Sequence, residues 1–184
     1  MMLRAGKLKR RMWVQSATET RDTFGQPVKS WTNAATVYGA DEPLTGAERY
    51  RAQQVNPNIS RKVTLRREVG VTDGLTERHR LLSPHWNTTL ATGINSTTQS
   101  VAVSSGAGIR DVGDIIRMGD EAMYVSAISG SNSTALTVTR GYFSTTAAAH
   151  SSGDVVEALR AINIDAALNV DMGDRIWQVM GIEG

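Results

Sequence analysis

The chain changes character part-way along its length, and this change most constrains what it can fold into. Residues 1–80 hold 15 of the 20 lysines and arginines but only 8 of the 18 acidic residues, whereas residues 81–184 contain no lysine. The formal charge is therefore about +7 in the first part and about −5 in the second. A difference of this size indicates two parts with different surfaces or different partners.

The first predicted strand covers residues 8–15, where apolar and polar side chains alternate. Trp13 is the exception, because it falls on the polar face with the basic residues. Two interpretations stay open for this side chain. It packs against a neighbouring segment of its own chain, or it contacts another subunit.

A second strand is predicted over residues 28–40, after a turn at 22–27 that is rich in glycine, proline and aspartate. Together the two strands form a long antiparallel hairpin. The second strand should end near Pro43, because proline cannot continue a hydrogen-bonded ladder. One face of this strand is expected to carry Trp31, Ala35 and Val37.

One helical segment is predicted over residues 45–54. Thr45, followed three positions later by Glu48, fits a capping box at its start. Ala47, Tyr50 and Gln54 are expected to lie on the same side of this helix. A third strand is predicted over residues 60–69, with Val63 and Leu65 facing inward.

The composition then shifts to glycine, serine, threonine and alanine from residue 87 to residue 153. Short β-like runs separated by glycine turns predict a small all-β module. These runs cover residues 100–104, 114–118, 122–128 and 135–140. The segment 145–152 is small and polar, and we expect an exposed loop there.

The last predicted strand, residues 175–182, is apolar on both faces and should therefore be covered. Its partner is expected in residues 1–80, which would make the middle module an insertion. We accordingly divide the chain into a core of residues 1–84 plus 161–184 and an inserted β domain of residues 85–160.

No residue pattern indicates catalysis or metal binding. The chain has no cysteine, which excludes disulfides and thiolate ligands. His79, His85 and His150 are scattered, and neither a phosphate loop nor a nucleophile elbow is present. The acidic pair at 120–121 lies in a turn and is expected to be solvated. We expect no enzyme, no catalytic residue, no metal and no cofactor. We also expect no membrane partner, because no stretch approaches the roughly 20 apolar residues of a spanning helix.

Two basic clusters are candidates for contacts with nucleic acid or protein. The N-terminal cluster could contact DNA phosphates, or it could be a solvated edge strand protected by charge. It consists of Arg4, Lys7, Lys9, Arg10 and Arg11. The second cluster could line a polar interface or a channel, or it could pair with Glu48 and Glu68. It consists of Arg49, Arg51, Arg61, Lys62, Arg66 and Arg67.

The run RAGKLKRRMWVQ at residues 4–15 resembles the opening of the head-tail joining proteins of tailed phages, the head-closure or stopper family. The stretches DTFGQPVKSW at 22–31, VYGADEPLTGAE at 37–48 and DRIWQVMGI at 174–182 follow in that family's order. The resemblance covers about residues 1–80 and 165–184. The middle departs from it and resembles a small β-module that recurs in phage virion proteins.

This resemblance implies an all-β fold: a small β-barrel-like core with one short helix, interrupted by the inserted β domain. It implies a structural virion protein of the head-tail neck, made in the host cytoplasm. The protein would form a ring, usually of twelve subunits, below the portal and adaptor. That ring would close the DNA channel and offer the tail a docking surface. The implied partners are further copies of the chain, portal and adaptor proteins, tail terminator or tail tube proteins, and packaged DNA through non-specific contacts.

The resemblance also assigns candidate roles to residues. Contacts between subunits or with the channel are expected in the region 41–60 and the strand after it. The candidates are Arg49, Tyr50, Arg51, Arg61 and Lys62. The N-terminal basic cluster is expected to face DNA or an interface, and Trp13 and Trp177 are candidate interface aromatics.

Two other functions stay open. The chain could be a tail or baseplate component instead. The inserted domain could also bind glycans or a cell surface through its aromatic residues, which are Trp86, Tyr124, Tyr142 and Phe143.

Overall fold

The computed structural model describes residues 5–66, 71, 74–109, 111–169 and 176–183. The chain divides into two compact units. Unit 1 is Met1–Ser83 with Ala161–Gly184, and unit 2 is Pro84–Arg160. Two strands, β4 (His79–Thr89) and β9 (Val155–Asn169), contribute residues to both units. That the second unit is an inserted domain remains a proposal.

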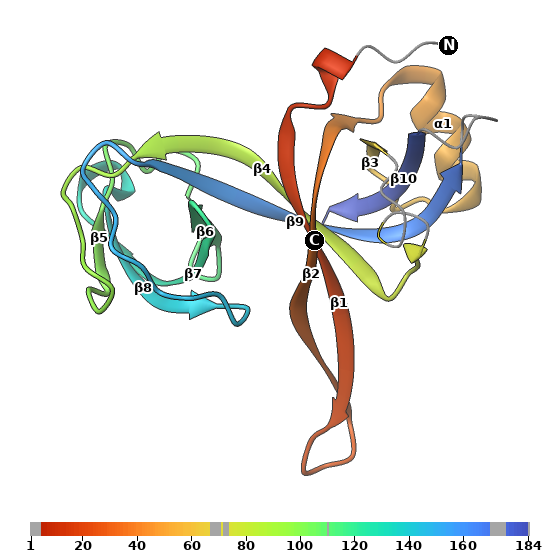
Figure 1. The fold of residues 1–184 in the computed structure, drawn as a ribbon. Coiled ribbons are helices and arrows are strands. Elements are labelled where there is room, and N and C mark those ends of the chain that lie inside the picture. Colours follow the sequence, from red (N-terminus) through yellow and green to blue (C-terminus); the bar gives the residue numbers. More distant parts are fainter. Residues whose placement is uncertain (1–4, 67–70, 72–73, 110, 170–175, 184) are drawn as a thin grey trace. The chain divides into compact units, whose positions relative to one another are not determined.

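Unit 1 is a closed barrel of six antiparallel strands. Its strands are β1 (Arg10–Arg21), β2 (Pro27–Pro43), β3 (Arg61–Arg66), β4, β9 and β10 (Ile176–Glu183). They follow the order β4-β1-β2-β3-β10-β9 around the barrel. The predicted all-β fold with a barrel-like core and one short helix is confirmed (Figure 1).

The barrel interior is filled by aliphatic side chains from every strand. Val63 and Leu65 are fully buried there, as predicted. The other buried members are Met12, Val14, Val37, Leu75, Leu81, Ile162, Ile164 and Val179. Their positions alternate along each strand, so the interior is apolar while the outward positions are mostly polar.

A bulge in the hairpin overturns the predicted face of β2. Gln15 pairs with Asn33, whereas the preceding residue Val14 pairs with Ala35, so β2 contains one extra residue at this point. An extra residue moves all side chains beyond it to the opposite face. Ala35 and Val37 therefore pack in or against the barrel core, and Trp31 lies on the other face.

The helix α1 (Gly46–Val55) lies where it was predicted, but its start and its packing differ. Thr45 is the N-cap residue and its side chain makes no capping hydrogen bond, so the predicted capping box is wrong. The Glu48 carboxylate instead pairs with the Lys62 ammonium at 2.5 Å. The residues predicted to share a helix face, Ala47, Tyr50 and Gln54, are all exposed. Among the helix side chains that the structure describes, Ala52 packs against Leu44 and Ile59.

A 3-10 turn (Ala5–Lys7) precedes β1. The described part of the third strand is Arg61–Arg66, and residues 67–69 of the prediction lie outside the described residues. The interval around Ser83 and Pro84, where the composition changes, is not a linker. It lies within β4, a strand that the alternation of side chains did not reveal.

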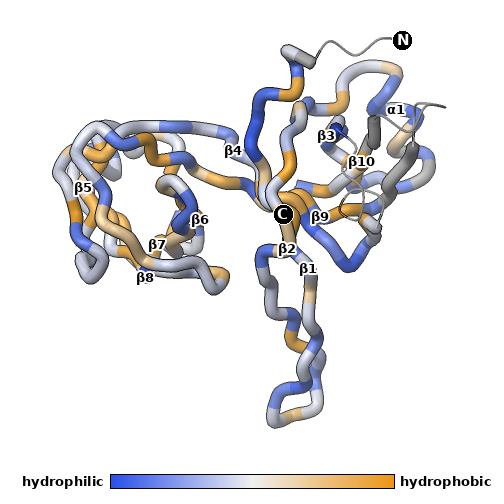
Figure 2. Tube along the Cα trace, in the orientation of Figure 1, coloured by the Kyte–Doolittle hydropathy of each residue, from blue (hydrophilic) through white to orange (hydrophobic). Residues whose placement is uncertain are grey.

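Unit 2 contains the four short strands expected in the middle of the chain. They are β5 (Ser100–Ala102), β6 (Ile115–Met118), β7 (Glu121–Ser129) and β8 (Ala135–Tyr142), with a 3-10 turn at Ser131–Ser133. Their order is β9-β6-β7-β8-β5, and Leu90 forms a bridge with Val103. These strands surround a separate apolar core, visible as the orange segments of unit 2 in Figure 2.

Gly39 provides a test of barrel packing. A Cβ atom at this position would lie 2.7 Å from the Leu65 Cδ2 atom and 2.7 Å from the Thr64 carbonyl oxygen. We expect Gly39→Ala to lower the free energy of unfolding by about 1–3 kcal/mol, because a backbone oxygen cannot move aside cheaply. Urea denaturation measures the change. Gly74→Ala is the control, since no atom lies within 4 Å of its added Cβ. Equal midpoints for the two variants would contradict the packing described.

Candidate interaction sites

The hairpin of β1 and β2 extends well beyond the barrel and forms a projecting arm, which we define as residues 18–30 (Figure 1). Every residue of the arm is exposed. Phe24, at its tip, exposes 89% of its surface, and Val28 is also exposed. We treat this long, fully exposed arm as a candidate contact surface.

The turn at the tip of the arm is fixed by Asp22. Its Oδ1 atom accepts hydrogen bonds from the backbone N–H groups of Phe24 at 2.9 Å and Gln26 at 2.8 Å. Gly25 adopts a φ of +81°, a conformation that favours glycine. The predicted turn at 22–27 is confirmed, and it holds Phe24 in a defined place.

A polar cluster anchors the arm where it leaves the barrel. The buried Gln15 side chain donates from Nε2 to Asn33 Oδ1 at 2.7 Å and accepts from Arg80 Nε at 2.8 Å. The Arg80 guanidinium also lies 4.2 Å from the ring centroid of Trp31, a cation–π contact. Sequence reasoning missed this cluster, because its members come from three strands and the bulge alone brings Trp31 to their face.

A second cluster surrounds the buried carboxylate of Asp41. Arg61 Nη1 donates to Asp41 Oδ1 at 2.9 Å, and Ser83 Oγ donates to Oδ2 at 2.9 Å. Arg10 Nη1 stands 3.9 Å from Oδ2. Arg61 also binds Glu183 Oε2 through Nε at 2.9 Å. Burial by itself lowers the pKa of Arg61, but the hydrogen bonds and charges of Glu183 and Asp41 outweigh it and raise the pKa.

The predicted contact residues therefore separate into two groups. The side chains of Arg61 and Lys62 are largely buried and form ion pairs with acidic residues of their own chain. By contrast, three neighbours are displayed on the exposed side of α1. They are Arg49, Tyr50 and Arg51, and Tyr50 is 68% exposed.

The N-terminal candidates are dispersed around the start of β1. Lys7, Lys9 and Arg10 are exposed and Arg11 is half-buried. Arg4 lies outside the described residues, as does the side chain of Trp177. Trp13 is only 3% exposed, so it packs within its own chain and has almost no surface to offer another subunit.

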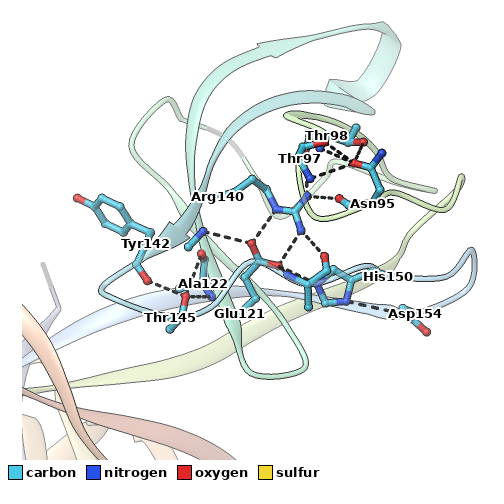
Figure 3. A network of polar contacts seen from close by, with 12 residues as sticks. Asn95, Thr97, Thr98, Glu121, Ala122, Arg140, Tyr142, Thr145, His150 and Asp154 are labelled. Carbon is cyan, nitrogen blue, oxygen red and sulfur yellow. Dashed lines mark hydrogen bonds and ion pairs between the residues drawn. The ribbon is translucent and has the colours of Figure 1, made fainter.

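Unit 2 contains a buried ionic network centred on Glu121, which is 1% exposed (Figure 3). Arg140 donates to both carboxylate oxygens, from Nε to Oε1 at 2.7 Å and from Nη2 to Oε2 at 2.8 Å. The Gly141 N–H also binds Oε1, while the Ala148 N–H and His150 Nε2 bind Oε2. The expectation that the acidic pair at 120–121 is solvated is wrong for Glu121.

The remaining donors of Arg140 join this carboxylate to two loops. Nη1 donates to the carbonyl oxygens of Asn95 and Thr98 at 2.8 Å each, and Nη2 donates to that of Ala148 at 2.5 Å. The predicted exposed loop at 145–152 is thus partly wrong, because Ala148 and His150 close over the carboxylate. Every acceptor site of Glu121 is occupied, which leaves it no lone pair for base catalysis and gives it a structural role.

Charge and hydrogen bonding determine the titration of Glu121. Burial by itself raises the pKa of this carboxyl, but the hydrogen bonds from Arg140, Ala148, His150 and Gly141 outweigh it. Together they lower the pKa from its ordinary value of 4.5 to about 2.

The four aromatic residues considered for glycan binding are arranged in two places. Tyr142 lies between Tyr124, at a ring-centroid distance of 5.2 Å, and Phe143, at 4.4 Å. Trp86 is half-buried and packs against the core of unit 2. All four are half-buried, so no fully exposed aromatic platform stands on the described part of unit 2.

Two further observations concern the described residues alone. No group of three or more histidine, cysteine, aspartate or glutamate side chains there is arranged to hold a metal ion. None of the helices described is long and apolar enough to cross a membrane.

Comparison with known proteins gives one family match. Residues 3–89 match the family described as phage head completion protein. The match begins before β1 and runs through β4, so it includes the arm, the Asp41 cluster and α1. No curated protein matches the chain.

The Asp41 cluster yields a matched pair of variants. We expect Asp41→Asn to lower the free energy of unfolding by about 3 kcal/mol, because it leaves the buried Arg61 without one of its two carboxylates. Glu48→Gln breaks a more exposed ion pair and should cost less than about 1 kcal/mol. Chemical denaturation measures both. If Asp41→Asn lowered the free energy of unfolding no more than Glu48→Gln does, the burial of the Asp41 cluster would not determine its contribution to stability.

The Glu121 network predicts a pH dependence of unit 2. A carboxyl whose folded pKa is depressed stabilises the fold fully above its ordinary pKa and loses that contribution as pH falls. From the lowered value, the contribution is about 3 kcal/mol and disappears between about pH 5 and pH 2. Hydrogen exchange of residues 94–98 and 141–150 across this range measures it.

The control variants for this prediction are neighbours in sequence. Glu121→Gln should remove most of the pH dependence and raise exchange at neutral pH. Asp120→Asn changes an exposed neighbour, whose interactions are screened by water, and should alter both much less. The same slope in the wild type and in Glu121→Gln would rule out Glu121 as the titrating group.

Proposed function

We propose, from the membership of residues 3–89 in the phage head completion family, that this protein is a component of the head-tail neck. The match confirms the predicted resemblance to head-tail joining proteins. Members of the family are structural proteins of the bacteriophage virion, and their role implies contacts with other head or tail proteins. The match is the single observation that carries the proposal, because it covers most of the strands that build the barrel.

The finer proposal is a ring of copies, twelve by analogy with the family, that closes the DNA channel and receives the tail. A closed ring needs two different complementary surfaces on each subunit. Unit 1 offers two exposed candidates: the arm, and the face of α1 that carries Arg49, Tyr50 and Arg51. We assign subunit or channel contacts to these surfaces. Arg61 and Lys62 serve them indirectly, by fixing β3 and α1 through ion pairs.

We assign non-specific DNA contact to the exposed basic residues at the start of β1. Lys7, Lys9 and Arg10 are exposed in the described chain, and Arg4 precedes them in the sequence. Flexible cations of this kind bind phosphates without reading bases. Portal, adaptor, tail terminator and tail tube proteins are the proposed protein partners.

We treat residues 85–160 as an inserted domain that decorates or braces the neck. The Glu121 network stabilises this domain. A domain that decorates or braces the neck does not need catalytic residues. A tail or baseplate location is the competing assignment, and it is an outcome of the experiment below.

Cryo-electron microscopy of intact virions tests the location. We expect density for this chain as a ring between the portal or adaptor and the tail, with unit 1 forming the ring. The number of copies of the chain in that ring gives the stoichiometry directly. If the chain is found at the tail tip or baseplate instead, the neck assignment is wrong and the inserted domain becomes the centre of interest.

A further inference from the structure

We propose that the arms of neighbouring copies pair edge to edge, β1 of one copy with β2 of the next, to form a continuous antiparallel sheet. This inference rests on the proposed ring. It names the surface through which one copy contacts the next, and the chemistry of that contact is backbone hydrogen bonding.

The outer edge of β2 lacks a strand partner over a long stretch among the residues that the structure describes. Strand β3 pairs with β2 at Gly39–Pro43, and the described residues contain no strand partner for that edge at positions 27–38. The outer edge of β1 is paired with β4 through Ser16, and the Ala17 N–H then donates to the Arg78 carbonyl at 2.9 Å. Within the described chain, residues 18–21 of that edge have no further strand partner.

The ladder shows which backbone groups face these edges. The Asp22 N–H donates to the Gln26 carbonyl, so hydrogen-bonded pairs alternate from there with pairs that point outward. Glu19 with Lys29, and Ala17 with Trp31, belong to the outward-pointing pairs. The contact from Ala17 to Arg78 agrees with this assignment, because it uses an outward N–H of β1.

An arm of this kind is incomplete by itself. A two-stranded hairpin is at best marginally stable in water, and free strand edges are templates for pairing with another chain. The polar cluster of Gln15, Asn33 and Arg80 fixes the base of the arm but leaves its outer part without support. No proline interrupts residues 28–38, so the long β2 edge can accept a partner strand.

A second copy fits these edges better than an unrelated protein. In a ring, identical arms point the same way, so β1 of one copy automatically runs antiparallel to β2 of its neighbour and has a similar length. The two edges differ, as a head-to-tail contact requires. The threonine-rich arm, pale and blue along much of Figure 2, suits a sheet with water on its faces.

Charge supports the same pairing. Lys29, on the β2 strand, and Glu19, on the β1 strand, stand 3.6 Å apart within one arm, and both side chains are largely exposed. Placing β1 of one copy beside β2 of the next at the same level brings a second Glu19 near each Lys29. Opposite charges facing across strands stabilise a pair, whereas the reverse arrangement, β2 against β2, would bring lysines together.

Disulfide cross-linking tests the pairing. The chain has no cysteine, so each variant with one introduced cysteine carries a single thiol. Thr20 and Val28 face each other within the arm's own ladder, so they occupy the closer, non-hydrogen-bonded positions of the proposed contact. Particles are assembled from an equal mixture of T20C and V28C and then oxidised. We expect disulfide-linked dimers in the mixture, and few in particles made from either variant alone.

A blocking variant provides the second measurement. Lys29→Pro removes an outward N–H without removing a bond of the arm's own ladder, and Lys29→Ala is its side-chain control. We expect Lys29→Pro to enter particles about tenfold less, the effect of losing one net backbone hydrogen bond per contact. Lys29→Ala loses the charge contact with Glu19 but keeps the outward N–H, so it should enter particles only a few-fold less than wild type. Circular dichroism melts show whether the proline variant keeps the barrel.

The outcomes separate this inference from the proposed function. If the wild-type chain sits in a neck ring but the mixture gives no dimers, edge pairing is wrong and the ring stands. Dimers as abundant in either single variant as in the mixture would mean a symmetric contact and would also overturn it. If wild-type protein is absent from the neck, the proposed function itself fails.

Discussion

The backbone ladder between β1 and β2 is the interaction on which unit 1 depends. Its inner half belongs to the barrel, where Met12, Val14 and Val37 fill the core. Its outer half leaves the barrel as the arm. The two halves share one pair of strands, so the barrel provides a rigid base from which the arm is presented. The bulge opposite Gln15 separates the barrel part of the ladder from the part that leads into the arm, because it redirects β2 side chains from the core to the outer face.

The basic character of unit 1 has two physical uses. Some of the positive charges form ion pairs within the chain: Arg61 pairs with both Asp41 and Glu183, and Lys62 of β3 pairs with Glu48 of α1. Of these pairs, Arg61–Asp41 is the one most shielded from water, because the Asp41 side chain is fully buried, whereas the Glu183 and Glu48 side chains are partly exposed. Other basic residues, such as Lys7, Lys9, Arg49 and Arg51, are exposed to solvent before β1 and on α1. A count of basic residues cannot separate these uses, since ion pairing depends on strands that are far apart in sequence.

Unit 2 is organised around one buried carboxylate in the same way that unit 1 is organised around its ladder. Glu121 begins β7, Arg140 lies near the end of β8, and His150 belongs to the loop that follows. One arginine therefore holds two loops against the strands with its full set of donors. This arrangement explains how a module made mainly of small residues, with few aromatics, keeps long loops in place.

Features that depend on neighbouring residues could be predicted from the amino-acid order. Short β-like runs separated by glycine turns predicted the strands of unit 2, and alternation predicted the inward positions of Val63 and Leu65. Glycine, proline and aspartate predicted the turn at 22–27. Motif order predicted the family. The face of Trp31, the burial of Trp13 and the pairing of Glu121 with Arg140 depend on contacts between distant strands and could not be predicted in this way. The reason is physical: alternation assigns faces only while register is unbroken, and one extra residue in a strand reverses them. A charged side chain, likewise, is buried or solvated according to partners that long-range strand pairing brings to it.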